Sequence, residues 1–291
     1  MEKFFSNAER AQILTQALPY IRRYTGKTVV VKYGGNAMIN EQLKQQVMED
    51  VVLLSLIGIK IVLVHGGGPE ISDLMEKMGK KAVFVDGLRV TDAETVDIVQ
   101  MVLAGKINKT LVNLLEMKGG RAMGLSGIDG HMIQATMKDA RLGFVGAITG
   151  VNIQPVTDVL EAGYIPVIST IGCDGEGSVY NINGDTAAAS IAGALNAERL
   201  IMLTDIAGIL REKDDPSTLI PNLTLAEAET LKQQGMITGG MIPKVNCCID
   251  AINKGVKKVI IMDGRVPHSI LMELLTDEGA GTMVQKGDDD E

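Results

Sequence analysis

Thr28-Val-Val-Val-Lys-Tyr-Gly-Gly-Asn-Ala-Met38 is the stretch that decides the fold of this chain. Residues 28–31 are all β-branched, which predicts a buried strand. Lys32 stands at the carboxyl end of that strand, and Gly34 and Gly35 follow it. Open α/β sheets bind ligands at such strand ends, where backbone N–H groups and a lysine can together hold phosphate. We therefore interpret Lys32 as a phosphate ligand; the alternative is an ordinary strand-end lysine that reaches for water.

The composition limits the classes of protein to which the chain can belong. With 291 residues, 46% of them hydrophobic, it is long enough for one large α/β domain or two lobes. A net charge of -8 and a pI of about 5.1 argue against a nucleic-acid-binding surface. We expect a cytoplasmic protein without membrane contact, because no apolar run reaches spanning length and the cysteine count is odd. The cysteines, which are not spaced as metal ligands, are Cys173, Cys247 and Cys248.

A kinked amphipathic helix is expected over residues 6–24, ahead of the first strand. Ser6 and Glu9 have the spacing of a capping box, Pro19 should kink the helix, and Gly26 ends it. Its apolar stripe must be buried either on its own subunit or on a second copy of the chain, and the pattern leaves both open. The stripe consists of Ile13, Leu14, Ala17, Leu18 and Ile21.

A second strand and a second glycine loop follow. The predicted strand 60–64 ends in His65-Gly-Gly-Gly-Pro69, after which a helix continues to about Met78. This arrangement again suits a phosphate or an oxyanion. The dinucleotide fingerprint Gly-x-Gly-x-x-Gly fails here, because Ile71 or Pro69 stands where a glycine is required. His65 could be catalytic, although a structural role is the more frequent one for a histidine at a strand end.

Gly87-Leu-Arg-Val-Thr-Asp92 is a predicted turn followed by a helix start. Arg89 in this turn could clamp a substrate carboxylate with two hydrogen bonds, or it could be an ordinary surface arginine. The helical region of residues 93–118 should break near Gly105. Residues 119–154 are rich in glycine and indicate one or two hairpins.

Three further loops stand in the second half of the chain. In Asn181-Ile-Asn-Gly-Asp185, Asp185 could cap the alanine-rich helix that follows, or it could orient lysines that converge on phosphate. Thr204-Asp-Ile-Ala-Gly208 is a polar loop after a predicted strand and a plausible nucleotide contact. Thr238-Gly-Gly-Met-Ile-Pro-Lys244 is a third glycine loop and leads into a helix.

Strands alternate with helices from residue 28 to the end of the chain. This pattern predicts an α/β fold with an open, mainly parallel central sheet sandwiched by helices. Three glycine loops with two lysines and one aspartate suit phosphoryl transfer, which depends on charge neutralisation more than on a protein nucleophile. The residues by themselves do not identify the acceptor of the phosphoryl group.

Six motifs, taken together and in order, resemble the amino acid kinase family, and within it the members that phosphorylate N-acetylglutamate. The resemblance covers about residues 28–284 and implies the fold of that family. It also implies an N-terminal extension helix, residues 1–26, in an oligomer contact; a lobe, 27–180, for acetylglutamate binding and dimerisation; and a lobe, 181–291, for ATP and arginine. The motifs are Val-Lys-Tyr-Gly-Gly, Val-His-Gly-Gly-Gly-Pro, Gly-Leu-Arg-Val-Thr, Asn-Ile-Asn-Gly-Asp-Thr-Ala-Ala, Thr-Asp-Ile-Ala-Gly-Ile-Leu and Gly-Gly-Met-Ile-Pro-Lys-Val.

The same resemblance implies the roles of single residues. Lys32 and Lys244 would stabilise the transferring phosphoryl group, and Asp185 would orient both. ATP would be the donor, with Mg²⁺ held mainly by its phosphates, so no protein metal ligand is expected. The residues expected to bind acetylglutamate are Gly67, Gly68, Arg89 and Asn181. The residues expected to contact ATP are Gly34, Gly35, Asp205, Gly208, Leu210, Met236 and Thr238.

The activity implied by the resemblance is phosphorylation of the γ-carboxylate of N-acetyl-L-glutamate by ATP, in arginine synthesis. The product would be an acyl phosphate, and no general base is needed because a carboxylate is already a nucleophile. The alternatives are another amino acid or carbamate kinase of the family and a non-catalytic metabolite sensor. The turn around Arg89, suited to an α-carboxylate, disfavours the first. The presence of Lys32, Asp185 and Lys244 disfavours the second.

The resemblance also predicts inhibition by arginine. The N-terminal helix resembles the extension of arginine-sensitive, hexameric family members, and residues 264–282 resemble their arginine-binding segment. Glu278 would pair with the guanidinium of arginine, His268 would bond the other end, and glycines such as Gly281 would leave backbone carbonyls within reach. The alternative is that Glu278 belongs to a plain turn between a helix and a strand.

Overall fold

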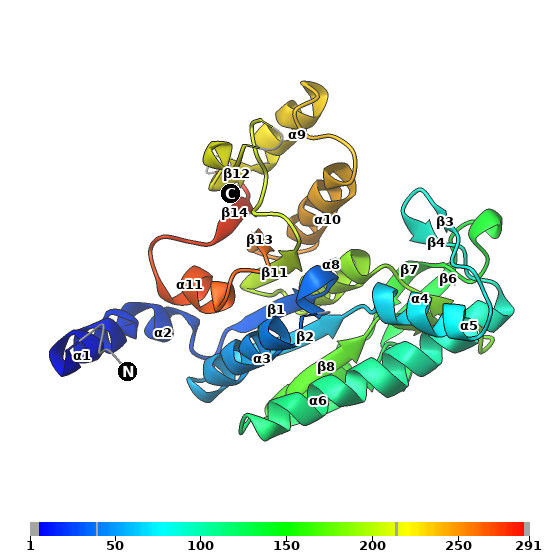
Figure 1. The fold of residues 1–291 in the computed structure, drawn as a ribbon, viewed down its shortest axis with the longest axis horizontal. Helices are drawn as coiled ribbons and strands as arrows, with labels where there is room; N and C mark the ends of the chain where they lie inside the picture. The colour runs from blue at the N-terminus through cyan, green and yellow to red at the C-terminus, as the bar shows by residue number, and fades with distance from the viewer. Residues whose placement is uncertain (1–5, 39, 213–214, 288–291) are drawn as a thin grey trace.

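The centre of the computed structural model, which describes residues 6–38, 40–212 and 215–287, is an eight-stranded sheet (Figure 1). The ends of the expected N-terminal segment and C-terminal lobe, residues 1–5 and 288–291, lie outside the described residues. All neighbouring strands are parallel except β13 and β14, which confirms the predicted sheet. In spatial order the strands are β12 (Asn222–Thr224), β14 (Gly281–Gln285), β13 (Lys258–Asp263), β11 (Arg199–Thr204), β1 (Thr28–Tyr33), β2 (Lys60–His65), β8 (Ile165–Ser169) and β5 (Ala122–Ser126).

Strand β1 lies inside the sheet and is buried on both faces. Val29 and Val31 belong to one hydrophobic cluster and Val30 to the other, because successive side chains of a strand point to opposite faces. β1 pairs with β2 on one side and β11 on the other. One continuous sheet therefore joins strands from both of the lobes that the sequence predicts.

Helices cover both faces of the sheet (Figure 1). The first cluster is closed by α3 (Glu41–Leu56), α4 (Gly68–Lys77), α5 (Ala93–Gln100), α6 (Asn108–Met117) and α11 (Ser269–Leu275). The second cluster is closed by α7 (Gln154–Glu161), α8 (Gly184–Ala194), α9 (Leu225–Gln233) and α10 (Met241–Asn253). No helix in the described ranges is both long and apolar enough to cross a lipid bilayer.

The helical region after residue 93 does not break at Gly105, so that prediction is wrong. A π-helical segment, η2 (Met101–Ile107), joins α5 to α6 without interruption, and Gly105 lies inside it. The segment widens the helix by an inserted residue, which accommodates glycine without ending the hydrogen-bond pattern. Because η2 packs beside the glycine loop at residues 66–68, this local irregularity matters for the site.

A smaller, four-stranded sheet and a two-stranded hairpin complete the fold. Strands β6 and β7 pair antiparallel, which confirms a hairpin within residues 119–154. The hairpin of β3 (Phe84–Val85) and β4 (Leu88–Arg89) turns through Asp86 and Gly87, both with positive φ, as two-residue hairpin turns require. It carries Arg89 toward the carboxyl edge of the main sheet. The four-stranded sheet consists of β10 (Val179–Asn181), β9 (Ile171–Cys173), β6 (Ile133–Met137) and β7 (Gly146–Val151).

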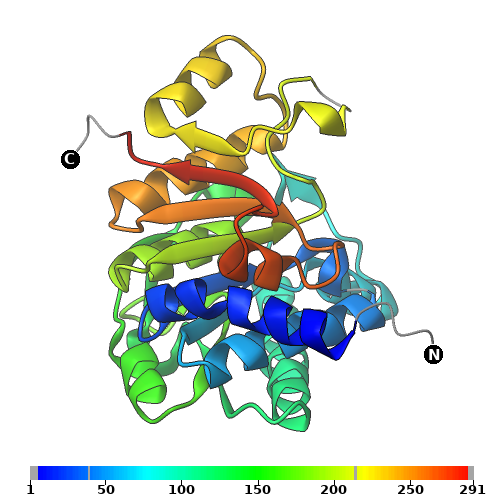
Figure 2. The ribbon, with the colours of Figure 1, turned by 90° about the vertical axis from the view of Figure 1, so that its left-hand side faces the viewer.

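The N-terminal segment forms two helices, α1 (Asn7–Gln16) and α2 (Leu18–Tyr24). The Ser6–Glu9 capping box is present, and Pro19 lies in the first turn of α2, where it is tolerated. α2 packs against α11 (Figure 2), whereas α1 projects from the body and buries none of its residues (Figure 1). The apolar stripe of α1 is therefore not covered within the described part of its own chain.

Candidate active site

Asp185 lies between the ammonium groups of two lysines that come from different elements. Lys32 is the penultimate residue of β1 and places Nζ 2.9 Å from Asp185 Oδ1. Lys244 lies in the first turn of α10 and places Nζ 3.3 Å from Asp185 Oδ2. Asp185 itself stands at the start of α8. Residues separated by up to 212 positions in the sequence, from Lys32 to Lys244, thus meet at the edge where the parallel strands end.

The carboxylate of Asp185 is available for the lysines because another residue caps the helix. Asn183 is the N-cap of α8, and its side-chain oxygen accepts hydrogen bonds from the N–H groups of Asp185 and Thr186. The interpretation of Asp185 as a simple cap is therefore wrong. Gly34 leaves room for the lysine, since a Cβ at that position would lie 2.7 Å from Lys32 Nζ.

Burial and charge act in opposite directions on Asp185. Burial disfavours the charged carboxylate, but the neighbouring ammonium groups, first Lys32 and then Lys244, still hold the pKa of Asp185 below its usual value. Two lysines around one ionised carboxylate leave a net positive charge of one. Such a preorganised positive centre suits the charge of a phosphoryl group in transfer.

A cavity of about 160 Å³ lies beside this centre, at the second glycine loop. Arg89 is 6% exposed, so the alternative of a surface arginine is wrong. Its Nη2 donates to Gly68 O and to Ser72 Oγ, each at 2.9 Å, and burial lowers the pKa of the guanidinium. The four predicted substrate residues that line this cavity together are Gly67, Gly68, Arg89 and Asn181.

A larger cavity of about 450 Å³ opens on the carboxyl-terminal side of the lysines. Lys244 is in its wall, together with five of the seven predicted ATP residues. Gly34 and Gly35 do not line it. Gly34 lies against the side chain of Lys32, and a Cβ at Gly35 would meet no atom within 4 Å. The five predicted ATP residues in the wall are Asp205, Gly208, Leu210, Met236 and Thr238.

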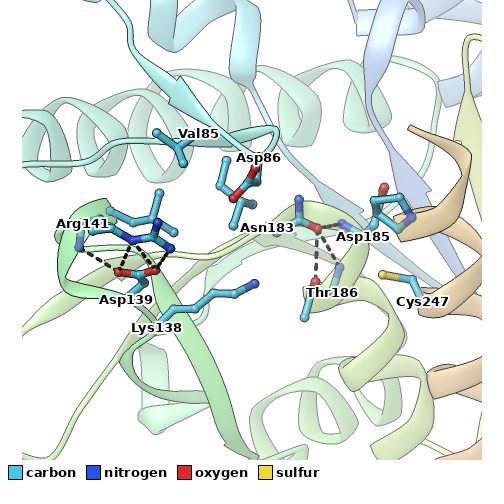
Figure 3. Close-up of a pocket in the computed structure, with 12 residues that line it drawn as sticks. Val85, Asp86, Lys138, Asp139, Arg141, Asn183, Asp185, Thr186 and Cys247 are labelled. Carbon is cyan, nitrogen blue, oxygen red and sulfur yellow. Dashed lines mark hydrogen bonds and ion pairs between the residues drawn. The ribbon is translucent and has the colours of Figure 1, made fainter. Parts of the chain in front are cut away.

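A third cavity, of about 370 Å³, adjoins Asp185 from the side of the β3–β4 turn (Figure 3). Asn183 lines both this cavity and that of the glycine loop, so the two are neighbours. In the described ranges no group of three or more histidine, cysteine, aspartate or glutamate side chains is arranged to hold a metal ion. The wall of the third cavity includes Asp86, Lys138 and Arg141 on one side and Asp185, Thr186 and Cys247 on the other (Figure 3).

A family model described as the amino acid kinase family matches residues 27–263 of this chain. The chain belongs to the amino acid kinase family. An acetylglutamate kinase of Clostridioides difficile (strain 630) is 55% identical over 281 residues, which cover 96% of this chain and 98% of that protein. An acetylglutamate kinase of Brachyspira hyodysenteriae is 54% identical over 283 residues, covering 97% and 98%.

Solved structures show the same amino acid kinase fold. An N-acetylglutamate synthase from Neisseria gonorrhoeae, complexed with coenzyme A and N-acetylglutamate, superimposes with a TM-score of 0.82 at 27% identity. The match covers 95% of this chain but 63% of that one. A carbamate kinase of Giardia has a TM-score of 0.67 at 19% identity, covering 90% of this chain and 99% of that one, and shows a likeness in fold alone.

The effector site that the sequence predicts for this amino acid kinase is brought together only in part. Glu278 and Gly281 line a cavity of about 250 Å³ between α2 and the start of β14. His268 is not in its lining; it precedes α11, with Nδ1 2.6 Å from Asp50 Oδ1. Burial raises the pKa of Asp50 to about 6, although the bond to His268 opposes this.

The sequence analysis did not identify the residues that hold the site residues of this kinase in position. Asn183 could have been found, because asparagine before Gly-Asp is a favoured N-cap. Asn108 and Ser72 could not, because both lie inside helices, and they contact His65 and Arg89 respectively only through the packing of those helices. His65 is fully buried and lines none of the cavities described above, which supports the structural interpretation.

Proposed function

We propose that this protein is an acetylglutamate kinase, which transfers the γ-phosphoryl group of ATP to the γ-carboxylate of N-acetyl-L-glutamate. The products are N-acetyl-L-glutamyl 5-phosphate and ADP, and the reaction serves arginine biosynthesis. The observation that carries the proposal is the Lys32–Asp185–Lys244 cluster between a small cavity and a larger one. Support comes from relatives named acetylglutamate kinase that are 55% and 54% identical along nearly their whole length.

In this proposal the two lysines neutralise the phosphoryl group while it moves. The γ-carboxylate of the substrate attacks the γ-phosphorus, the bond to the β–γ bridging oxygen breaks, and ADP leaves with that electron pair. Asp185 holds both ammonium groups in position and takes no proton, since its pKa is lowered. ATP binds as its magnesium complex; the ion would be held mainly by phosphates, because both oxygens of Asp185 already face lysines.

Substrate selection is assigned to the smaller cavity. Arg89 would pair with the α-carboxylate through the guanidinium donors not used by Gly68 and Ser72. Asn181 donates to Thr91 Oγ1 at 3.3 Å and would lie beside the substrate. The N–H groups of the glycine loop would bind a carboxylate or the acetyl oxygen. The substrate side of the site would thus belong to a lobe of residues 27–180 and the ATP side to a lobe of residues 181–291.

A coupled assay for ADP release tests the proposal. The purified protein is offered ATP, Mg²⁺ and, in turn, N-acetylglutamate, glutamate, aspartate and carbamate. We expect turnover with N-acetylglutamate at least about 100-fold above the others, because a site with buried donors rejects substrates that leave them unpaired. Preference for carbamate or a free amino acid would make the protein another kinase of the family. No turnover with any acceptor, despite ATP binding, would favour a metabolite sensor.

We also propose that arginine inhibits the enzyme and that α1 joins subunits into a homo-oligomer, a dimer and further a hexamer. The exposed apolar side chains of α1, Ile13 at 49% and Leu14 at 74%, support a subunit contact. Glu278 offers a carboxylate for a guanidinium in a cavity partly walled by α2. We expect the reaction to run in the cytoplasm, where thiols stay reduced, in accord with three free cysteines.

Deletion of residues 1–25 tests this regulation. The shortened protein should form a smaller oligomer by light scattering, keep its catalytic activity and respond more weakly to arginine. Arginine must bind the inhibited state more tightly to act, and the N-terminal helix could transmit that state between subunits. A full-length enzyme indifferent to millimolar arginine would end the proposal of inhibition and leave the kinase assignment intact.

A further inference from the structure

His65 and the peptide group that follows it form a contact that the proposed reaction does not yet use. The imidazole is 0% exposed, and its Nδ1 lies 2.9 Å from the carbonyl oxygen of Gly66. A carbonyl oxygen only accepts, so Nδ1 must carry the hydrogen. In the neutral ring Nε2 is then an acceptor. Asn108 Nδ2 lies 3.2 Å from Nε2 and donates to it.

The amide of Asn108 cannot be turned around without loss, and it therefore selects this tautomer. Its Nδ2 also lies 2.8 Å from Val167 O and 3.1 Å from Leu125 O, so its two hydrogens are shared among three acceptors, the His65 Nε2 and these two carbonyl oxygens. Its Oδ1 accepts from Lys109 Nζ at 3.1 Å. A flipped amide would set an oxygen against two carbonyl oxygens. Asn108 is thus held as a donor, and a donor at Nε2 excludes a hydrogen on that nitrogen.

The direction of the Gly66 carbonyl determines the direction of the next N–H group. The described peptide bonds are all trans, and in a trans peptide group the carbonyl and the following N–H point in opposite directions. Because the carbonyl points at the His65 ring, the N–H of Gly67 points away from it. Neither Gly67 nor Gly68 donates its N–H to an acceptor within the described residues, and both line the small cavity.

The far side of the loop is closed by the π-helical segment η2. A Cβ at Gly67 would overlap Ile107 Cδ1 and come within 2.7 Å of Leu103 Cδ2. The residue after Ile107 is Asn108, so one short piece of chain both packs on the loop and supports the histidine. π-helical turns occur often at functional sites because the inserted residue redirects neighbouring side chains. The loop therefore has little freedom to rotate its peptide groups.

We propose that His65 is a positioning residue for the phosphorylation reaction. Its Nδ1–H holds the Gly66–Gly67 peptide group so that the Gly67 N–H is directed at the bound acid, and Asn108 enforces the required tautomer. His65 takes part in no proton transfer. This inference rests on the proposed function for the identity of the acid, but the tautomer and the direction of the peptide group do not depend on it.

Two substitutions distinguish the two hydrogen bonds of the His65 imidazole, one to the Gly66 carbonyl and one from Asn108. In His65→Asn the side-chain amide can replace Nδ1–H and keep the bond to the Gly66 carbonyl. In His65→Gln the longer side chain reaches the position of Nε2 and keeps the partner Asn108, but loses the bond to Gly66. We expect kcat/KM for N-acetylglutamate to be about tenfold lower in His65→Gln than in His65→Asn, the effect of one lost hydrogen bond. The KM for ATP should stay within about twofold of wild type in both.

The proposal would be overturned if kcat/KM for N-acetylglutamate fell equally in the two variants, or if kcat/KM for ATP fell as much as that for N-acetylglutamate. His65 would then have a packing role only. If the wild type phosphorylates a different acid, the same comparison is made with that acid. Failure of the proposed function and failure of this inference are thus seen in separate measurements.

A measurement on the unmodified protein decides the tautomer even if a variant does not fold. The chain has three histidines, so proton–nitrogen correlation spectra of histidine-labelled protein are assigned by replacing His131 and His268 in turn. We expect His65 to remain neutral, with its hydrogen on Nδ1, from pH 6 to 8. A hydrogen on Nε2, or a charged ring in that range, would overturn the proposal.

Discussion

Two glycine loops flank the Lys32–Asp185–Lys244 cluster, and they use glycine for different reasons. At Gly67 there is no room for a Cβ, because Ile107 and Leu103 lie against the backbone. At Gly239 and Gly240 no atom lies within 4 Å of an added Cβ; Gly239 has a φ of +55° instead. The first loop lines a cavity of about 160 Å³ and the second one of about 450 Å³.

Similar sequence motifs can therefore require glycine for close packing in one loop and for backbone conformation in another. A loop packed on both sides holds its N–H groups in fixed directions, which suits a small acid that must be oriented. A loop with free space around it suits a larger ligand that enters and leaves through an open mouth. One of the two lysines that we propose to be catalytic stands near each loop, and Asp185 pairs with both. The four predictions that follow test this contrast.

The largest effect is expected at the cluster between the loops. Lys32→Ala and Lys244→Ala should each lower kcat by about 100- to 1000-fold, because each removes one preorganised positive charge from the transition state. Steady-state ADP release at saturating substrates measures this. Lys254→Ala is the matched control at the C-cap of α10. Lys254 pairs with Asp250 and donates to Ser190 Oγ, neither of which belongs to the cluster, so this variant should keep near-normal turnover. Near-normal turnover in either cluster variant would refute the assigned mechanism.

His65, which is buried next to the first glycine loop, should make the stability of the fold sensitive to acid. Burial lowers the pKa of His65 from 6.5 to about 4, so the unfolded chain takes up a proton at higher pH than the folded protein does. Stability is therefore lost as the pH falls from 6.5 toward 4, by about 1.5 kcal/mol between pH 6.5 and 5.

Urea unfolding of the wild type and of His65→Asn across this pH range isolates this contribution to stability. The unfolding free energy of the wild type minus that of His65→Asn should decrease as the pH falls from 6.5 toward 4. The opposite effect of Asp50, whose pKa is raised, cancels because both proteins contain it. A difference that stays constant from pH 7 to pH 5 would mean that the ring is protonated as easily in the folded protein as in the unfolded chain.

Alanine substitutions compare the two loops directly. Gly67→Ala should lower the unfolding free energy by about 1 to 2 kcal/mol, since its Cβ requires buried side chains of η2 to move. Gly240→Ala should change it by no more than about 0.5 kcal/mol, because its φ of -66° suits alanine and the space is open. Similar losses at both positions, measured by denaturant unfolding, would show that the loops do not differ as described.

The smallest effect is expected from Arg89→Lys. The charge remains, but the planar fork that serves Gly68, Ser72 and the substrate together is lost. The KM for N-acetylglutamate should rise by about threefold to tenfold, and the KM for ATP should stay unchanged. Initial rates with each substrate varied in turn measure both. A parallel rise in the two constants would point to a general structural role for Arg89.

Much of the main sheet could be predicted from the sequence, because its strands are β-branched apolar runs that end in glycine or polar loops. β1 and β2 were predicted to within two residues, and the period of α3 was clear. The two-residue strands of the β3–β4 hairpin and the three-residue strands β9, β10 and β12 were missed. Elements this short have too few residues to show an alternating hydrophobic pattern. They form by pairing with other strands.

For the candidate site, the residue types and the motif order indicated Lys32, Asp185 and Lys244, because a lysine or aspartate beside glycine at a strand end has few structural uses. The convergence of the three could not be predicted from spacing alone, since α8, α10 and β1 meet only when the sheet is assembled. His268 shows the reverse: its segment matched a motif, but in the structure its imidazole contacts Asp50 on α3.

The sequence was enough to predict the class of fold and to propose the chemistry of the site, because buried strands, glycine loops and charged residues at strand ends are local features. The tertiary structure alone decided how the loops differ, since packing around a glycine depends on helices far away in the chain. It also decided the tautomer of His65, through an asparagine 43 residues away. Hydrogen bonds have direction, and direction becomes known only when donor and acceptor are placed in space.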